Sequence, residues 1–293
     1  MALVTPSAAQ IALRNYVTDY ANSVILSVTS EQTQWRKEYL RDPMRSSKWR
    51  STSAAAQSFY TQLGAGIVGN PGIFALINSN LRSGQAITLE LSDESTVSSG
   101  GTGYAKWNLT AYAQTRRKVM RFYLGAPNTV GANGSASRSF MKVTLANNGT
   151  GDSDGDGIND TYHELALPYI CAAADMASLQ LDLGLTRRVI DPSIRVEHDA
   201  GAAYTDPKPT YHEVDMDSST VPWATSKNLL AAIDEIGIKR HVLADIWAPQ
   251  SDATMISQGC YYGFLSDKDE VAEFECSLPG YDDTGFRFVE ARA

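Results

Sequence analysis

Short apolar runs that alternate with polar residues limit this chain, more than any other feature, to a β-rich fold. Residues 86–91 place Ile87, Leu89 and Leu91 on one side of an extended segment, as expected of a strand with one buried face. Stretches rich in glycine, serine and asparagine separate such runs, and we interpret them as loops. Many short strands between turns are typical of a β-sandwich or barrel. Further strands are predicted at residues 24–28, 119–124, 140–145, 179–183, 242–247, 261–265, 271–277 and 286–290.

The chain has 293 residues, which is more than one compact core usually holds. The pattern of residue types changes near residue 207. Pro207, Pro209 and Pro222 bracket a stretch that we interpret as a connection between two parts. A helix is predicted at about residues 226–236, with Gly237 suited to its C-terminal end. Apolar residues are expected on one face of this helix: Leu229, Leu230, Ile233 and Ile236.

Residues 152–160, Asp-Ser-Asp-Gly-Asp-Gly-Ile-Asn-Asp, have the ligand order of a calcium loop of the EF-hand kind. The expected metal ligands are Asp152, Asp154, Asp156, the carbonyl oxygen of Ile158, and Asp160. The twelfth position, which normally holds a bidentate glutamate, is His163, and Glu164 follows one residue late. A water could also fill this position, and a solvated Asp/Gly turn without metal is the alternative. The spacing favours a weak, structural Ca²⁺ site in loop 152–164.

The composition excludes some classes of protein. The formal net charge is −8 with acids and bases mixed along the chain, which argues against nucleic-acid binding. Cys171, Cys260 and Cys276 lack metal-site spacing, and we expect buried free thiols. The sequence contains no recognisable signal peptide and no membrane span, so we expect a soluble protein made in the cytoplasm. A weak calcium site fills mainly outside cells, which favours a particle released by lysis.

Several motifs between residues 41 and 91 occur in the order found in one family of β-sandwich domains. They are Arg-Asp-Pro at 41–43, Trp-Arg-Ser at 49–51, Ala-Gln-Ser-Phe at 56–59, Leu-Gly at 63–64, Ala-Leu-Ile at 75–77 and Asn-Leu at 80–81. Residues 138–143, Arg-Ser-Phe-Met-Lys-Val, are similar to a late strand of the same domains. The chain thus resembles the discoidin-like, galactose-binding jelly roll of bacteriophage tail proteins. The resemblance implies a mainly β fold, with a jelly-roll β-sandwich over residues 1–200 and a smaller α+β assembly module over 201–293.

Two residues of this resemblance have more than one interpretation. Trp49 is expected in the core of the sandwich, because large aromatic residues dominate core burial, and a sugar-stacking platform is the alternative. Arg50 either pairs with Asp42 inside the protein or meets a ligand. The sequence leaves the glycan-contacting residues of such a domain unknown.

Catalysis is not expected. The chain has no Gly-x-Ser-x-Gly elbow, no His-Glu-x-x-His helix and no phosphate-cradling glycine loop. Its histidines are isolated in sequence: His163, His198, His212 and His241. Asp215, Asp217 and Asp245 are the acids nearest to predicted strand ends, and we interpret them as solvated loop or capping residues rather than as a glycosidase pair.

The resemblance and the calcium loop together predict a structural virion component, a minor tail protein of a phage tail tip or baseplate. Its expected partners are other tail proteins and copies of itself in a ring, with neither nucleic acid nor a membrane span. The alternative is a carbohydrate-binding module that attaches the particle to host-surface glycans. A polysaccharide-degrading tail enzyme is the third possibility.

Overall fold

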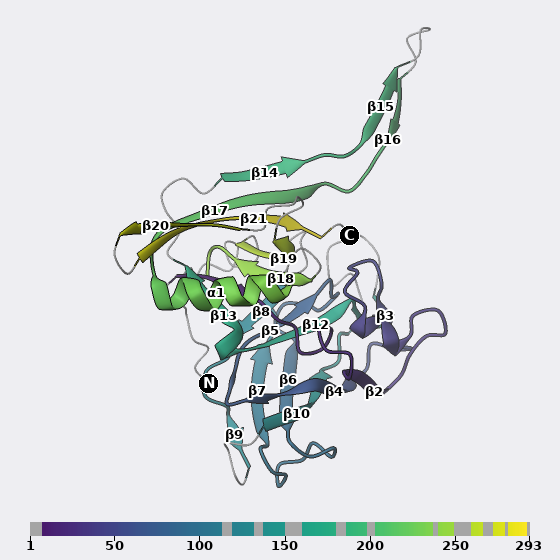
Figure 1. Cartoon of the computed structure of the whole chain (residues 1–293). Coiled ribbons are helices and arrows are strands. Elements are labelled where there is room, and N and C mark those ends of the chain that lie inside the picture. The colour runs from purple at the N-terminus through teal and green to yellow at the C-terminus, as the bar shows by residue number, and fades with distance from the viewer. Residues whose placement is uncertain are drawn as a thin grey trace. The chain divides into compact units, whose positions relative to one another are not determined.

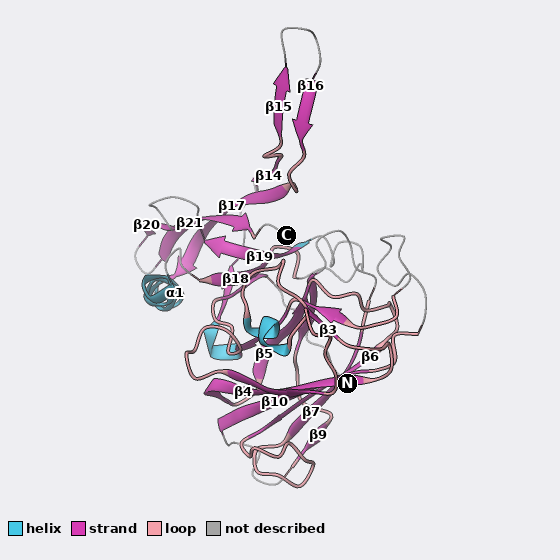
Figure 2. Cartoon of the chain, turned by 90° about the vertical axis from the view of Figure 1, so that its right-hand side faces the viewer, coloured by secondary structure: helices cyan, strands magenta, loops and turns pink. Residues whose placement is uncertain are grey.

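The protein forms two compact units, which we describe from a computed structural model (Figure 1). Unit 1 contains Met1–Ser178 and Leu243–Tyr261, and unit 2 contains Leu179–Val242 and Tyr262–Ala293. The structure describes residues 8–112, 119–131, 137–149, 160–179, 186–197, 203–236, 240–248, 259–265, 272–278 and 281–291. Most described elements are strands (Figure 2), so the predicted mainly β fold class is confirmed. The domain boundary at residue 200 stays a prediction.

Unit 1 contains two antiparallel sheets. The larger has the strand order β2-β4-β10-β6-β7-β9 and the smaller has the order β12-β5-β8. The six strands of the larger sheet are β2 (Val24–Val28), β4 (Gln57–Val68), β6 (Ala86–Ser92), β7 (Ala105–Thr110), β9 (Thr129–Val130) and β10 (Ser137–Leu145). The smaller sheet contains β5 (Pro71–Ile77), β8 (Val119–Tyr123) and β12 (Leu167–Ala172). The chain passes repeatedly from one sheet to the other, as in a jelly roll.

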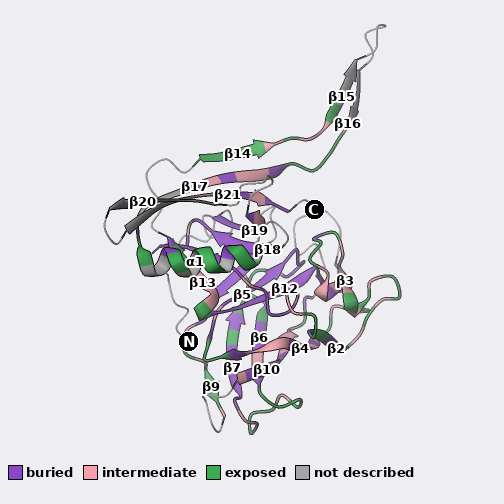
Figure 3. Cartoon of the chain, viewed as in Figure 1, coloured by how far each residue is buried: buried purple, intermediate pink, exposed green. Residues whose placement is uncertain are grey.

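The two sheets bury a common core. Every second side chain is buried over residues 57–63 of β4 and 141–145 of β10, which is the pattern of strands with one face on the core (Figure 3). Phe59 and Val143 from the larger sheet lie in one cluster with Phe74 and Ile170 from the smaller sheet. Unit 1 is therefore a jelly-roll β-sandwich, as the resemblance implies.

Short elements complete unit 1. β3 (Trp49–Arg50) pairs with β11 (Glu164–Leu165), and η1 (Lys37–Arg41) is a 3₁₀ turn between β2 and β3. β1 (Ala9–Ala12) pairs through residues 10–12 with residues 243–245 of β18 (His241–Asp245). The remaining elements are η2 (Ala173–Asp175) and β13 (Met176–Leu179), so the strand predicted at 179–183 lies mostly outside the described residues.

Unit 2 combines a sheet with one helix. β17 (Tyr211–Pro222) pairs with β14 (Thr186–Ile190) and β21 (Tyr281–Glu290), and β21 also pairs with β19 (Cys260–Leu265) and β20 (Ala272–Leu278). A hairpin is formed by β15 (Ile194–Glu197) and β16 (Ala203–Asp206). The helix α1 (Trp223–Ile236) contacts β17 and β21. This unit has the α+β character predicted for the second part.

Two predictions about the second part are wrong in detail. Most of the stretch between Pro207 and Pro222 is the strand β17 rather than a connection. Val214 and Met216 are buried on one side of β17. Pro222 is the last residue of the strand, a position where the missing N–H of a proline is tolerated. Leu230 does not share the buried face of α1, because 43% of its surface is exposed, whereas Ile233 is buried. The side chains of Leu229 and Ile236 are outside the described set.

Candidate functional site

The predicted calcium ligands lie mostly outside the described residues, namely Asp152, Asp154, Asp156 and Ile158. Asp160 is described and buried, and its Oδ1 accepts a hydrogen bond of 2.8 Å from the side-chain amide of Asn80. In the described part of the chain, no three His, Cys, Asp or Glu residues lie close enough together to hold a metal ion. The calcium site therefore stays a prediction.

The two residues near the twelfth loop position are engaged inside the fold. Nε2 of His163 lies 3.1 Å and 3.0 Å from the carbonyl oxygens of Ala54 and Ala55, and burial lowers the pKa of this histidine. Both carboxylate oxygens of Glu164 form ion pairs, one with Lys48 and one with Arg50. Glu164 is thus already neutralised by two cations, which leaves its carboxylate little negative charge to offer a calcium ion.

The structure settles the two interpretations of the Trp-Arg-Ser motif. Trp49 has no exposed surface and its indole N–H donates to the Ser30 carbonyl at 3.1 Å, so it is a core residue and not a sugar platform. Arg50 pairs with Glu164 at 2.6 Å, and its guanidinium lies 3.8 Å from the ring centroid of Trp35. Of the two interpretations of Arg50, the pairing with Asp42 is wrong. The Asp42 carboxylate instead accepts hydrogen bonds from the Met44 N–H and the Ser47 hydroxyl.

The other titratable residues considered from the sequence have structural contacts. Asp215 lies between Arg188 and Arg287, at 3.0 Å and 2.9 Å. His212 is 2.7 Å from Glu290, and His241 stacks on Tyr262. His198 and the side chain of Asp217 are outside the described set.

Buried polar groups in unit 1 are also used structurally. Asp245 is buried with Arg121, and the hydroxyl of Tyr123 donates to it at 2.9 Å. It is therefore a core residue and not the solvated loop or capping residue that the sequence suggested. Cys171 and Cys260 are buried thiols outside any disulfide, and burial raises the pKa of Cys171 to about 12. The side chain of Cys276 is not among those described.

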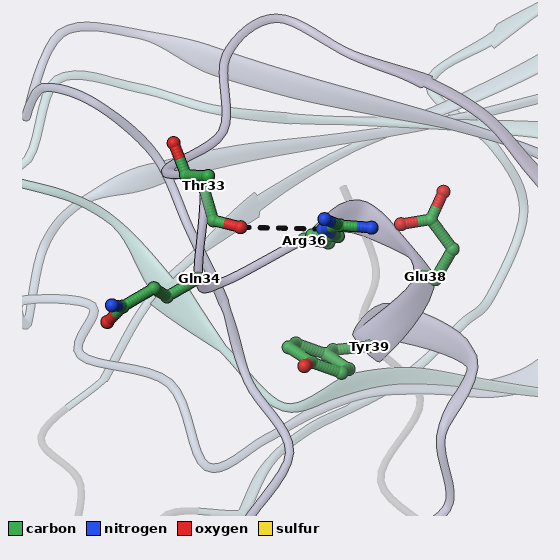
Figure 4. Close-up of a pocket in the computed structure, with 5 residues that line it drawn as sticks. All are labelled: Thr33, Gln34, Arg36, Glu38 and Tyr39. Atoms are coloured by element: carbon green, nitrogen blue, oxygen red, sulfur yellow. Dashed lines mark hydrogen bonds between the residues drawn. The ribbon is translucent and has the colours of Figure 1, made fainter.

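An open depression beside η1 is the best candidate for a binding site (Figure 4). It has a volume of ≈ 540 Å³ and is lined by Thr33, Gln34, Arg36, Glu38 and Tyr39. These side chains offer a hydroxyl, an amide, a guanidinium, a carboxylate and a phenol ring within one short segment. None of these five residues is buried, so a ligand can reach them.

The backbone holds this segment in a fixed conformation. The N–H of Lys37 donates to the Glu31 carboxylate at 2.6 Å, and the N–H of Tyr39 donates to the Arg36 carbonyl at 3.1 Å. Arg36 Nε donates to the Thr33 carbonyl at 3.4 Å, which Figure 4 shows as a dashed line. Leu40, with no exposed surface, anchors η1 in the core. The binding groups are thus presented by a segment that is already ordered.

A second depression of ≈ 670 Å³ adjoins the first, since Glu38 and Tyr39 line both. Its other lining residues are Thr18, Val24, Ile25, Lys37, Arg41 and Asp42. Within it, Lys37 Nζ donates to the Leu26 carbonyl at 3.1 Å, and Arg41 donates to the carbonyls of Tyr20 and Ala21 at 3.1 Å and 2.9 Å. Together the two depressions form a surface on both sides of Glu38 and Tyr39.

Sequence reasoning missed this site, although residues 32–39, Gln-Thr-Gln-Trp-Arg-Lys-Glu-Tyr, carry a signal. They mix polar and aromatic residues without strand alternation, which is typical of a binding loop on a rigid scaffold.

Comparison with known proteins gives matches among solved structures alone, as no family model and no curated protein sequence matches the chain. A carbohydrate-binding module of a family 31 glycoside hydrolase from Clostridium perfringens has 14% identity and a TM-score of 0.36, over 54% of this chain and 95% of that one. The family 32 module of Clostridium perfringens NanJ, in complex with galactose, has 14% identity and a TM-score of 0.34, over 56% and 97%. Reduced XRCC1, bound to the catalytic domain of DNA polymerase β, has 15% identity and a TM-score of 0.34, over 50% and 94%.

These three similar structures differ in what they bind, and their scores are low. None of the three is a phage tail protein, so the tail assignment stays a prediction. No helix in the described part of the chain has the length and apolar character that crossing a bilayer requires.

Proposed function

We propose that this protein binds carbohydrate at the two depressions around η1. The observation that carries the proposal is the set of side chains on the first depression, where one aromatic ring lies among four polar groups. A sugar unit presents hydroxyls that both donate and accept hydrogen bonds, together with an apolar face of C–H bonds. Arg36 can donate, Glu38 can accept, and the Tyr39 ring can pack against the apolar face.

The shape of the site favours a glycan on a surface over a small metabolite. A drug-sized ligand normally requires a concave pocket that covers most of its surface. The two depressions are open and continuous through Glu38 and Tyr39, so they suit a chain of sugar units that remains partly in solvent. Binding at such a site is expected to be weak for one sugar unit.

Replacing Tyr39 by alanine is expected to weaken glycan binding about two- to tenfold, because an aromatic contact contributes about 0.5–1.5 kcal/mol beyond area burial. Titration calorimetry with galactose and galactose-terminated oligosaccharides measures this change. Tyr39→Phe keeps the ring and should retain most of the affinity. Tyr60→Ala removes another partly exposed tyrosine, on β4, and should leave binding unchanged. Equal affinities for Tyr39→Ala and the native protein would contradict glycan binding at this site.

Release of sugar fragments during the titration would instead favour the polysaccharide-degrading alternative.

We also propose that calcium binds the loop at residues 152–160. The support is the ligand spacing together with Asp160, whose carboxylate is already fixed by Asn80. A metal that binds the folded protein alone raises its stability by mass action.

Calcium in excess of its dissociation constant is expected to raise the melting midpoint by about 2–4 °C over the value in EDTA. The Asp154→Ala variant should show no such rise, whereas Asp93→Ala, in an exposed loop outside the motif, should behave as the native protein does. Identical melting curves in EDTA and in calcium would rule out the site.

A place in a phage tail tip or baseplate remains a prediction of the sequence resemblance, and glycan binding would suit attachment of such a particle to its host. Genes for a tape measure or tail hub beside this one would support it.

A further inference from the structure

The exposed side of helix α1 in unit 2 includes a stripe formed by Trp223, Lys227, Leu230 and Asp234, and Ala231 and Glu235 are exposed beside this stripe. Trp223 is 63% exposed and Leu230 is 43% exposed. Lys227, which lies between them in the sequence, and Asp234, which follows them, are also exposed. At 100° per residue, these four positions lie within about 60° of one another around the helix. Figure 3 shows exposed positions along α1.

Another side of the helix, about 80° around its axis from the centre of the stripe, packs on its own unit. Ser226 and Ile233 are 1% and 5% exposed, and the helix contacts β17 and β21. The stripe is therefore not a displaced core face. An exposed tryptophan is unusual on a surface without a partner, because Trp is enriched at protein interfaces and among residues that dominate binding energy.

The charges on the stripe fit a second copy of the same stripe. If two α1 helices pack antiparallel about a two-fold axis at the level of Leu230 and Ala231, Lys227 of one copy faces Asp234 of the other. The symmetry makes this contact twice, on either side of a small apolar centre. A parallel arrangement would place like charges together.

We propose that α1 is the interface of a symmetric dimer in which two copies of this chain pack their α1 helices antiparallel. The helix has 14 residues, which corresponds to a length of about 21 Å. One helix pair of this length buries less surface than a standard stable interface, so the dimer is weak and concentration-dependent. The proposal does not depend on glycan binding.

Two charge-reversal variants test this arrangement. Analytical ultracentrifugation compares the association of each variant alone with that of a mixture of the two. Lys227→Asp alone replaces both attractive contacts by Asp–Asp contacts, and Asp234→Lys alone replaces both by Lys–Lys contacts. Each variant alone should dissociate at least about tenfold more readily than the native protein. When the two are mixed, both contacts become Asp–Lys again, so the mixture should dimerise as the native protein does.

Thermal melting shows whether each variant is folded, which is expected because both positions are exposed. Asp93→Lys places the same charge reversal on a loop of unit 1, and it should leave the native dimer intact. Leu230→Asp should abolish association. A native protein that remains monomeric at the highest soluble concentration would overturn the proposal, and so would a mixture that associates no better than its components.

Discussion

Replacing Arg121 by methionine is expected to lower the free energy of unfolding by about 3–5 kcal/mol, because it leaves a buried carboxylate without its cation. Arg121 and Asp245 are 5% and 1% exposed, and they form an ion pair inside unit 1. Burial raises the pKa of Asp245, while Arg121 and the hydrogen bonds from Tyr123 and the Trp247 N–H act in the opposite direction. Without Arg121, the remaining donors are neutral and the charged form of Asp245 becomes costly.

Urea unfolding of Arg121→Met measures this loss, and the double variant Arg121→Met with Asp245→Leu is its control. The double variant removes both charges, so it should lose less stability than the single variant. A single variant within about 1 kcal/mol of the native protein, or a double variant that is less stable than the single one, would contradict this description of the pair.

Replacing Trp49 by alanine is expected to cost about 3–5 kcal/mol of stability, because the change leaves a large cavity in a close-packed core. The ring of Trp49 has no exposed surface and meets Phe59 edge-on, with 6.5 Å between ring centroids. The substitution also leaves the Ser30 carbonyl without the indole N–H.

Urea unfolding of Trp49→Phe, Trp49→Ala and Trp35→Ala separates packing from other effects. Trp49→Phe retains most of the volume and should lose less than Trp49→Ala, while Trp35→Ala removes a partly exposed ring and should have a smaller effect. If Trp49→Ala had near-native stability and had lost glycan binding, the core role of Trp49 would be contradicted and the sugar-stacking alternative supported.

The strands β2, β6, β8 and β10 of unit 1 were predictable because their signal is local. β6 alternates Ile87, Leu89 and Leu91 with polar residues, and the structure buries these three against the core. β17 was missed because prolines near both ends of the stretch suggested a connection, although Pro222 merely terminates the strand. For both β6 and β17, the prediction depended only on residues within or next to the segment itself.

Contacts between distant residues could not be predicted in the same way. The sequence offered the nearby Asp42 as one possible partner of Arg50, yet its partner Glu164 lies 114 residues along the chain. The pairing of β3 with β11 brings Arg50 opposite Glu164, and this register follows from the tertiary fold. The depression at residues 33–39 was likewise missed, because the mixture of polar and aromatic residues there indicates a binding loop but not the concave shape that the fold gives it.

The most direct test of glycan binding around η1 is a titration of the ¹⁵N-labelled protein with galactose-terminated oligosaccharide, followed by amide chemical shifts. We expect concentration-dependent shifts at the residues that line the first depression, Thr33, Gln34, Arg36, Glu38 and Tyr39. Shifts confined to other loops, or no shifts at a large excess of glycan, would contradict the proposed site.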